Sequence, residues 1–197
     1  MTKKKRKQKT TVYISLEGKK EKAFFDFLDA IYSPKENSIN INLSPKYGGS
    51  SDTILRQALK MKDNYDKVYA WFDEDLKLSD EIKERLSQAW AVEKFDGNIK
   101  DCDLQSTYNL ENRNPILIVS SPCSMDGFLI QLCGGTVPKT LNTANCKNAF
   151  ASIIDINACS CEEEFYKKTF AREIIETKEK DFPLLKLILS VFKDKKV

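Results

Sequence analysis

Residues 68–72 (VYAWF) constrain the fold most, because five consecutive apolar residues are typical of a strand that is buried on both faces. Such strands occur in parallel sheets covered by helices on both sides. Other short apolar or alternating segments, and segments with helical spacing of apolar residues, agree with this interpretation. Strands are expected over 11–16, 38–43, 68–72 and 116–119, and helices over 20–32, 52–61, 79–95 and 127–133. Strands that alternate with helices indicate βαβ units, so the sequence predicts an α/β fold with a mostly parallel, Rossmann-like sheet.

The two ends of the chain depart from this alternation. Residues 1–10 contain six lysines and arginines, so the rest of the chain has a formal net charge of −3, the total of +3 less these six. We expect a basic flexible tail that either binds phosphate backbones or is simply solvated. Residues 11–197 are predicted to form a single domain, with a C-terminal helical extension from about residue 140.

Two helices are expected in this extension, over 162–177 and 183–193. The second is apolar around much of its circumference. This pattern favours packing in the core, but it leaves open an interface in a homo-oligomer.

The chain contains no histidine. This absence excludes Ser-His-Asp hydrolases, Cys-His proteases and every metal site built on imidazole. A hydrolase of this sequence would have to use carboxylates, lysines, hydroxyls or cysteines. No G-x-x-x-x-G-K-[ST] segment is present, so the chain is not itself expected to be a P-loop ATPase.

The six cysteines include no C-x-x-C pair, which favours reduced thiols over disulfides. A zinc site formed by Cys133, Cys146, Cys159 and Cys161 is the alternative. Cys123 is expected to be a small packed residue rather than a nucleophile, because no histidine can activate it. No apolar run is long enough to span a membrane and no secretory signal is visible, so we expect a cytoplasmic protein without a membrane partner.

Acidic residues follow two of the predicted strands. Glu17 comes directly after the first strand, and Asp73 and Asp75 come after the third. Because the carboxyl ends of parallel strands meet at one edge of a sheet, we expect these carboxylates to lie close together. Asp73 and Asp75 should point to one side and Glu74 away from them, since successive side chains of an extended segment alternate.

Clustered carboxylates repel one another unless protons or cations neutralise them. Mg²⁺ or Mn²⁺ suits such a site, because these ions are held by one or two carboxylates, water and substrate phosphate. Glu17 is the candidate general acid or base and also a candidate metal ligand, with Asp73 and Asp75 as the other ligands. Three nearby lysines could contact a phosphate backbone: Lys19, Lys20 and Lys22. The alternative is an acidic loop that supports the next helix.

Several of these segments carry a family resemblance. They are residues 17–25 (EGKKEKAFF), 48–50 (GGS), 73–75 (DED) and 118–129 (IVSSPCSMDGFL). A strand followed by E-G-K, then helix, strand, helix and a strand ending in D-x-D resembles the Toprim domain of topoisomerases, primases and several nucleases. Within that group the chain is most similar to the RloB-like, abortive-infection proteins of bacterial phage defence. The resemblance covers about residues 11–132.

The resemblance implies a metal-dependent nuclease that cleaves RNA or DNA as a toxic effector, with an AAA- or ABC-type ATPase as partner. It makes Asp126 an auxiliary catalytic acid, although the family has glutamate there with a spacing shorter by one residue. An acid that interacts with a helix N-terminus is the other interpretation of Asp126. Lys20 replaces the family's usual threonine. Two further functions stay open: a non-catalytic regulatory subunit that binds nucleic acid or an ATPase, and an RNA-processing Toprim nuclease.

Overall fold

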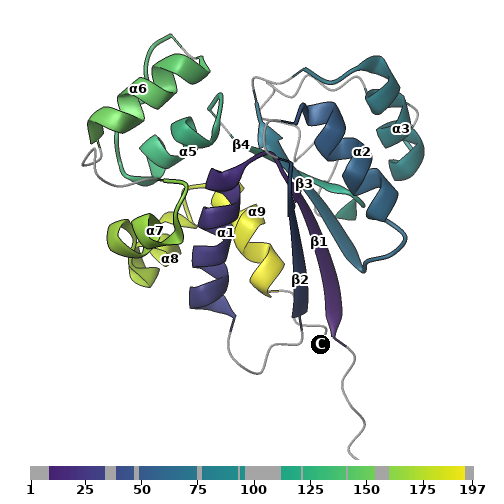
Figure 1. Ribbon diagram of the computed structural model, residues 1–197, viewed down its shortest axis with the longest axis horizontal. Helices are drawn as coiled ribbons and strands as arrows, with labels where there is room; N and C mark the ends of the chain where they lie inside the picture. Colours follow the sequence, from purple (N-terminus) through teal and green to yellow (C-terminus); the bar gives the residue numbers. More distant parts are fainter. Residues whose placement is uncertain are drawn as a thin grey trace, which may run out of the picture.

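The computed structural model describes residues 9–33, 39–46, 49–74, 77–92, 94–95, 112–120, 122–140, 142–153 and 160–193. In this part of the chain, four strands form one sheet in the order β2-β1-β3-β4, and every pairing is parallel (Figure 1). The strands are β1 (Thr10–Leu16), β2 (Ile39–Pro45), β3 (Lys67–Asp73) and β4 (Ile116–Ser120). The predicted parallel α/β sheet with a Rossmann-like arrangement is therefore confirmed.

Helices cover both faces of the sheet (Figure 1). One layer consists of α2 (Ser51–Met61) and α3 (Asp80–Trp90). The other contains α1 (Lys19–Tyr32), α5 (Met125–Leu132), α6 (Thr143–Ile153), α7 (Glu163–Thr169), α8 (Arg172–Lys178) and α9 (Pro183–Lys193). Among the described residues, none of these helices combines the length and the apolar character needed to cross a bilayer.

The apolar strand β3 separates two hydrophobic clusters. Val68, Ala70 and Phe72 face the cluster under α2 and α3. Tyr69 and Trp71 face the larger cluster under α1 and the C-terminal helices. Both faces of this strand are buried, which explains why its sequence is apolar without alternation.

The helix predicted over residues 79–95 is shorter than expected, because α3 ends at Trp90. Ala91 has a φ of 51°, in the left-handed region, and the chain turns back there. This turn lets the Phe95 N–H donate to Ser87 Oγ at 2.7 Å. It also places the centroid of the Phe95 ring 5.0 Å from that of the Trp90 ring. Phe95 is therefore buried by this turn of the chain and not by a further turn of helix.

Two helices, α7 and α8, replace the single helix predicted over 162–177. Phe170 lies between them in an extended conformation (φ −124°, ψ 121°) and is buried. Its ring packs near Tyr166 and Phe27, at centroid distances of 6.4 Å from each. The helix α6 was not predicted, because only Cys146 and Phe150 on it are buried and its apolar periodicity is weak.

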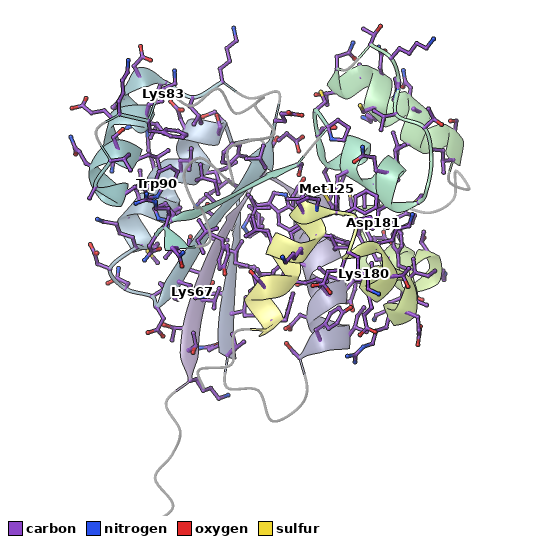
Figure 2. All side chains as sticks on the ribbon, turned by 180° about the vertical axis from the view of Figure 1, so that it is seen from behind. Lys67, Lys83, Trp90, Met125, Lys180 and Asp181 are labelled. Atoms are coloured by element: carbon purple, nitrogen blue, oxygen red, sulfur yellow. The ribbon has the colours of Figure 1, made fainter. Side chains whose placement is uncertain are left out.

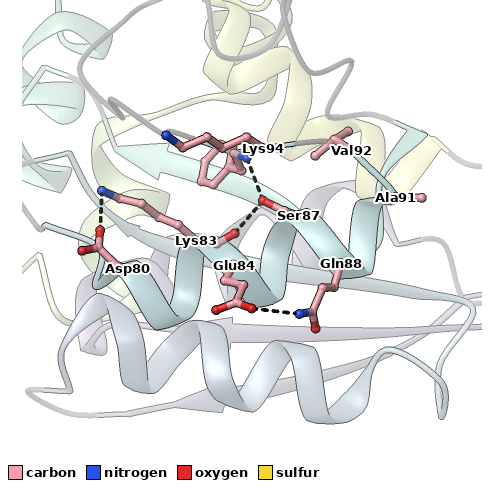
Figure 3. Close-up of a pocket in the computed structure, with 9 residues that line it drawn as sticks. Asp80, Lys83, Glu84, Ser87, Gln88, Ala91, Val92 and Lys94 are labelled. Atoms are coloured by element: carbon pink, nitrogen blue, oxygen red, sulfur yellow. Dashed lines mark hydrogen bonds and ion pairs between the residues drawn. The ribbon is translucent and has the colours of Figure 1, made fainter.

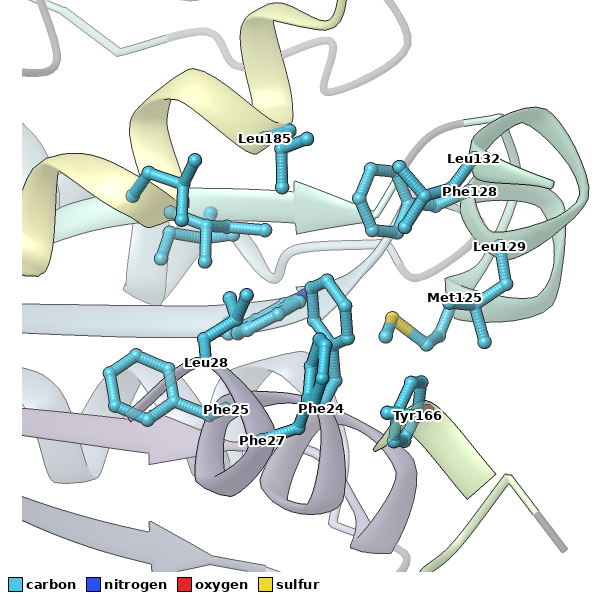
Figure 4. Packing of buried hydrophobic residues seen from close by; sticks show 14 of the residues in the cluster. Phe24, Phe25, Phe27, Leu28, Met125, Phe128, Leu129, Leu132, Tyr166 and Leu185 are labelled. Carbon is cyan, nitrogen blue, oxygen red and sulfur yellow. The ribbon is translucent and has the colours of Figure 1, made fainter. Parts of the chain in front are cut away.

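The C-terminal helices share the larger core with the sheet. Six apolar side chains of α9 are buried there: Leu185, Leu187, Ile188, Leu189, Val191 and Phe192. The Phe192 ring lies 4.9 Å from that of Phe25 on α1. Figure 4 shows Leu185 of α9 facing the same cluster as Phe24 and Tyr166. Core packing thus explains the apolar character of α9.

Candidate active site at the carboxyl edge of the sheet

Glu17 and Asp73 meet at the carboxyl edge of the sheet. The register of β1 and β3 pairs Leu16 with Trp71, so Glu17 leaves β1 beside the last two residues of β3, Phe72 and Asp73. The Glu17 N–H donates to the Trp71 carbonyl at 3.1 Å, and Glu17 Oε2 accepts a hydrogen bond from the Asp73 N–H at 3.0 Å. The carboxylate of Glu17 is therefore held against the end of the neighbouring strand.

Asp73 and Glu74 both contact the segment that joins β4 to α5. Asp73 Oδ1 accepts from the Met125 N–H at 2.8 Å, and Glu74 Oε2 accepts from the Cys123 N–H at 2.6 Å. Figure 2 shows Met125 at the end of the sheet opposite Lys67, the first residue of β3. Glu74 was expected to point away from Asp73, but both carboxylates contact the same segment; β3 ends at Asp73, so the alternation of an extended strand does not continue to Glu74. Asp75 lies outside the described residues.

Asp73 takes over the capping role at the start of α5. Ser124 is the N-cap residue, but its side chain makes no capping hydrogen bond, and its buried hydroxyl has no hydrogen-bond partner among the described residues. The carboxylate of Asp73 instead receives the first helical N–H, where the helix dipole also favours a negative charge. The helix predicted over 127–133 accordingly begins earlier, at Met125.

Gly127 is required by the close approach of two backbone segments. A Cβ atom at this position would lie 2.0 Å from the carbonyl oxygen of Pro122. Cys123 lies between Pro122 and Gly127 in the sequence. It adopts a φ of 66°, and its side chain is buried. The loop that contacts Asp73 and Glu74 is therefore tightly packed.

Lys20 and Asp126 form an ion pair of 2.5 Å between the first turns of α1 and α5. The Asp126 side chain is 6% exposed and that of Lys20 is 26% exposed. Because each charge is largely removed from water, each depends on the other for compensation. The structure thus pairs the predicted auxiliary acid with one of the predicted phosphate-contacting lysines.

The other two candidate lysines differ from each other. Lys22 forms an ion pair with Asp26 at 2.5 Å, one helical turn further along α1. Lys19 is exposed at the start of this helix, next to Glu17 and Gly18. Of the three, Lys19 is the one that solvent reaches best.

Glu21 is a site residue that the sequence analysis missed. It is only 5% exposed, and this burial raises the pKa of Glu21 to about 7; the nearby charge of Glu17 acts in the same direction. Gly18 is close to it, since a Cβ there would lie 3.1 Å from Glu21 Oε2. The available signal was spacing: Glu21 precedes Phe24, Phe25 and Leu28 by three, four and seven residues, which places it on the apolar face of the helix.

The donor chemistry at this edge fits Mg²⁺ or Mn²⁺ in one respect. Glu17 and Asp73 offer two carboxylates from neighbouring strands, the number that such ions often take from a protein. Within the described ranges, no group of three or more Cys, Asp or Glu residues is arranged to hold a metal ion. Two carboxylates would therefore need water and substrate oxygens as further ligands.

The alternative of a zinc site concerns four cysteines. Three of them, Cys133, Cys146 and Cys161, form no zinc group in the described part of the chain, and Cys159 lies outside it.

A separate depression of about 730 Å³ lies beside α3 (Figure 3). Its lining includes Asp80, Lys83, Ser87 and Phe95, and none of the predicted site residues. Lys83 forms an ion pair with Asp80 at 3.4 Å, and Ser87 accepts a hydrogen bond from the Phe95 N–H.

Comparison of the chain with protein-family models, with curated proteins and with solved structures finds no match in any of the three.

Proposed function

We propose that the protein is a Toprim-like nuclease that uses Mg²⁺ or Mn²⁺ to hydrolyse phosphodiester bonds of RNA or DNA. It would act as a toxic effector in an abortive-infection system, with an AAA- or ABC-type ATPase as partner. The observation that carries the proposal is the meeting of Glu17 and Asp73 at adjacent strand ends, with Glu17 Oε2 3.0 Å from the Asp73 nitrogen. Sites of α/β sheets form at this edge.

Glu17 and Asp73 are the residues that would hold the metal ion. A bound metal ion would stabilise negative charge on the phosphate and lower the pKa of a water molecule. Lys19, which is exposed beside Glu17, would contact the phosphate backbone. Glu21 would hold a proton close to Glu17 near neutral pH, because its burial favours the neutral form.

The test is cleavage of DNA, total RNA and tRNA by the purified protein in Mg²⁺ or Mn²⁺. We expect Glu17→Gln and Asp73→Asn to lower cleavage at least about 100-fold, since even residues that only support metal ligands contribute 10- to 100-fold. Asp66→Asn is the matched control. Asp66 also binds a backbone N–H, that of Thr11 at 2.7 Å, but it lies at the amino edge of the sheet. Cleavage and toxicity that survive in both site variants would show the assignment to be wrong.

A non-catalytic module that binds nucleic acid or an ATPase is the second candidate. The observation that favours it is that Asp73 and Glu74 both bind backbone N–H groups of residues 123–125, a role in supporting α5. Titration calorimetry separates the two candidates. Absence of Mg²⁺ and Mn²⁺ binding, together with nucleic-acid binding that Asp73→Asn leaves unchanged, would favour the non-catalytic module.

A further inference from the structure

The strand β2 forms an edge of the sheet. In the described part of the chain, β1 is the only strand that pairs with it, over the full length Ile39–Pro45 (Figure 1). Ile39, Ile41 and Leu43 pack partly against the larger core, whereas Asn40 and Asn42 are exposed. An edge strand presents backbone N–H and C=O groups that can pair with another chain.

Common features that protect an edge strand from pairing are missing from most of β2. Residues 39–45 contain no charged side chain, and their one proline, Pro45, is the last residue of the strand. The register with β1 advances one residue at a time, so no bulge interrupts it. The opposite edge of the sheet differs, because four of the five residues of β4 are buried. The indole N–H of Trp90 also donates to the carbonyl of Pro115, just before β4, at 3.0 Å. Of the two edges, β2 is the one suited to pairing.

The sequence of β2 is nearly the same in both directions. Around Ile41, residues 39–43 read I-N-I-N-L. If two copies pair antiparallel with Ile41 on the twofold axis, Ile41 lies opposite Ile41, Ile39 opposite Leu43, and Asn40 opposite Asn42. Residues directly opposite in an antiparallel pair share one face of the sheet. Apolar residues would therefore meet apolar residues, amides would meet amides, and no like charges would be opposed.

We propose that β2 is a homodimer interface, in which two copies of the chain pair antiparallel about Ile41 and join their sheets into one. A twofold contact of this kind uses the same patch on both copies. The near-palindrome favours a second copy over a foreign chain, because its pattern is complementary to itself. The strands of the two copies would run in opposite directions. The candidate active site of one copy, at the carboxyl ends of its strands, would therefore lie at the opposite end of the strands from the candidate active site of the other copy. The inference does not depend on the proposed function.

Sedimentation of the full chain over a concentration series tests the dimer, and paired charge variants test the register. Asn40→Lys with Asn42→Lys places lysine opposite lysine twice across the interface. Asn40→Lys with Asn42→Glu places lysine opposite glutamate twice. We expect the first double variant to dissociate on the order of tenfold more readily than the second, because opposite charges across a strand pair stabilise it and like charges destabilise it.

The two double variants are matched to each other. Both lose the hydrogen bond of 3.0 Å from Asn42 Nδ2 to Tyr65 Oη, and the circular dichroism of dilute samples checks that both are folded. The wild-type chain needs no substitution, and a monomer at every concentration would overturn the proposal by itself. So would a dimer that Asn40→Lys with Asn42→Lys does not weaken. Equal weakening in both double variants would refute the register about Ile41 and with it the proposal.

Discussion

At the scale of single residues, the carboxyl group of Glu21 carries an energetic cost, because it is buried at the first turn of α1. Its surroundings are Gly18, the charge of Glu17 and the apolar face that continues to Phe24. Burial of a carboxylate favours its protonated form, and the pKa of about 7 expresses this preference. Near neutral pH the folded protein therefore keeps a proton that an exposed glutamate would have released.

This shift predicts that the protein loses stability as the pH rises. The pKa of Glu21 is about 7 in the folded state against 4.5 for an ordinary glutamate, so the folded state binds more protons between these values. The free energy of unfolding should fall across that window, by about 3 kcal/mol in total, and stay constant above it. Urea unfolding of the metal-free protein in EDTA at pH 5 and pH 8 measures the change.

Glu21→Gln should remove most of this pH dependence, because glutamine does not titrate. Glu164→Gln, an exposed position on α7, serves as the control and should retain it. A Glu21→Gln variant with the same pH dependence as the wild type would contradict the argument.

At the scale of elements, the start of α5 is held by side chains from the end of β3. Asp73 binds the Met125 N–H and Glu74 binds the Cys123 N–H, while Asp126 in the first turn pairs with Lys20 of α1. The helix thereby links the carboxyl ends of β3 and β4 to the first turn of α1. A displacement of α5 would alter the surroundings of Asp73 directly.

Gly127→Ala should destabilise the protein by about 1–3 kcal/mol, because the new Cβ would clash with the Pro122 carbonyl oxygen. The control is Gly134→Ala, just after the same helix. Gly134 has a φ of 77° but nothing within 4 Å of a Cβ, so only backbone strain of about 1 kcal/mol is expected. Urea unfolding compares the two variants. A Gly127→Ala variant as stable as the wild type would show that the loop relaxes around a side chain.

At the scale of the whole molecule, the C-terminal helices complete the hydrophobic core on one face of the sheet. Tyr166 of α7 is fully buried and packs against Phe24 and Phe27 at centroid distances of 5.2 and 6.0 Å. Its hydroxyl lies 3.3 Å from the carbonyl of Lys20, next to the candidate site. The helices beyond residue 140 therefore support the first turn of α1 as well as the core.

Ile188→Ala tests whether α9 belongs to the core of a single chain. Ile188 is completely buried, so its truncation should lower the free energy of unfolding by about 2–5 kcal/mol. Lys186→Ala, at an exposed position of the same helix, should change it by less than about 0.5 kcal/mol. The unfolding midpoint in urea, measured at low protein concentration, gives both values. An Ile188→Ala variant that is destabilised only at high concentration would instead place α9 in an interface between chains.

Local patterns account for much of the fold. The strands β1, β2, β3 and β4 lie where the alternating and apolar segments predict them, because burial on one or two faces imposes its period on the sequence. Helix ends were predicted less well. The end of α3 depends on Phe95, which folds back onto Trp90 and Ser87 of the same helix. The break between α7 and α8 depends on Phe170, whose ring reaches Phe27 on α1.

The sequence by itself determined the alternation of strands and helices, the absence of imidazole chemistry, and the place of Glu17 and Asp73 at the carboxyl ends of two strands. The tertiary structure alone decided which groups meet at that edge. It joins Lys20 to Asp126, 106 residues apart, and Glu74 to Cys123, 49 residues apart. It also buries Glu21 enough to shift its pKa. The physical reason is that periodicity reports the burial of neighbouring residues, whereas these contacts depend on how whole elements pack.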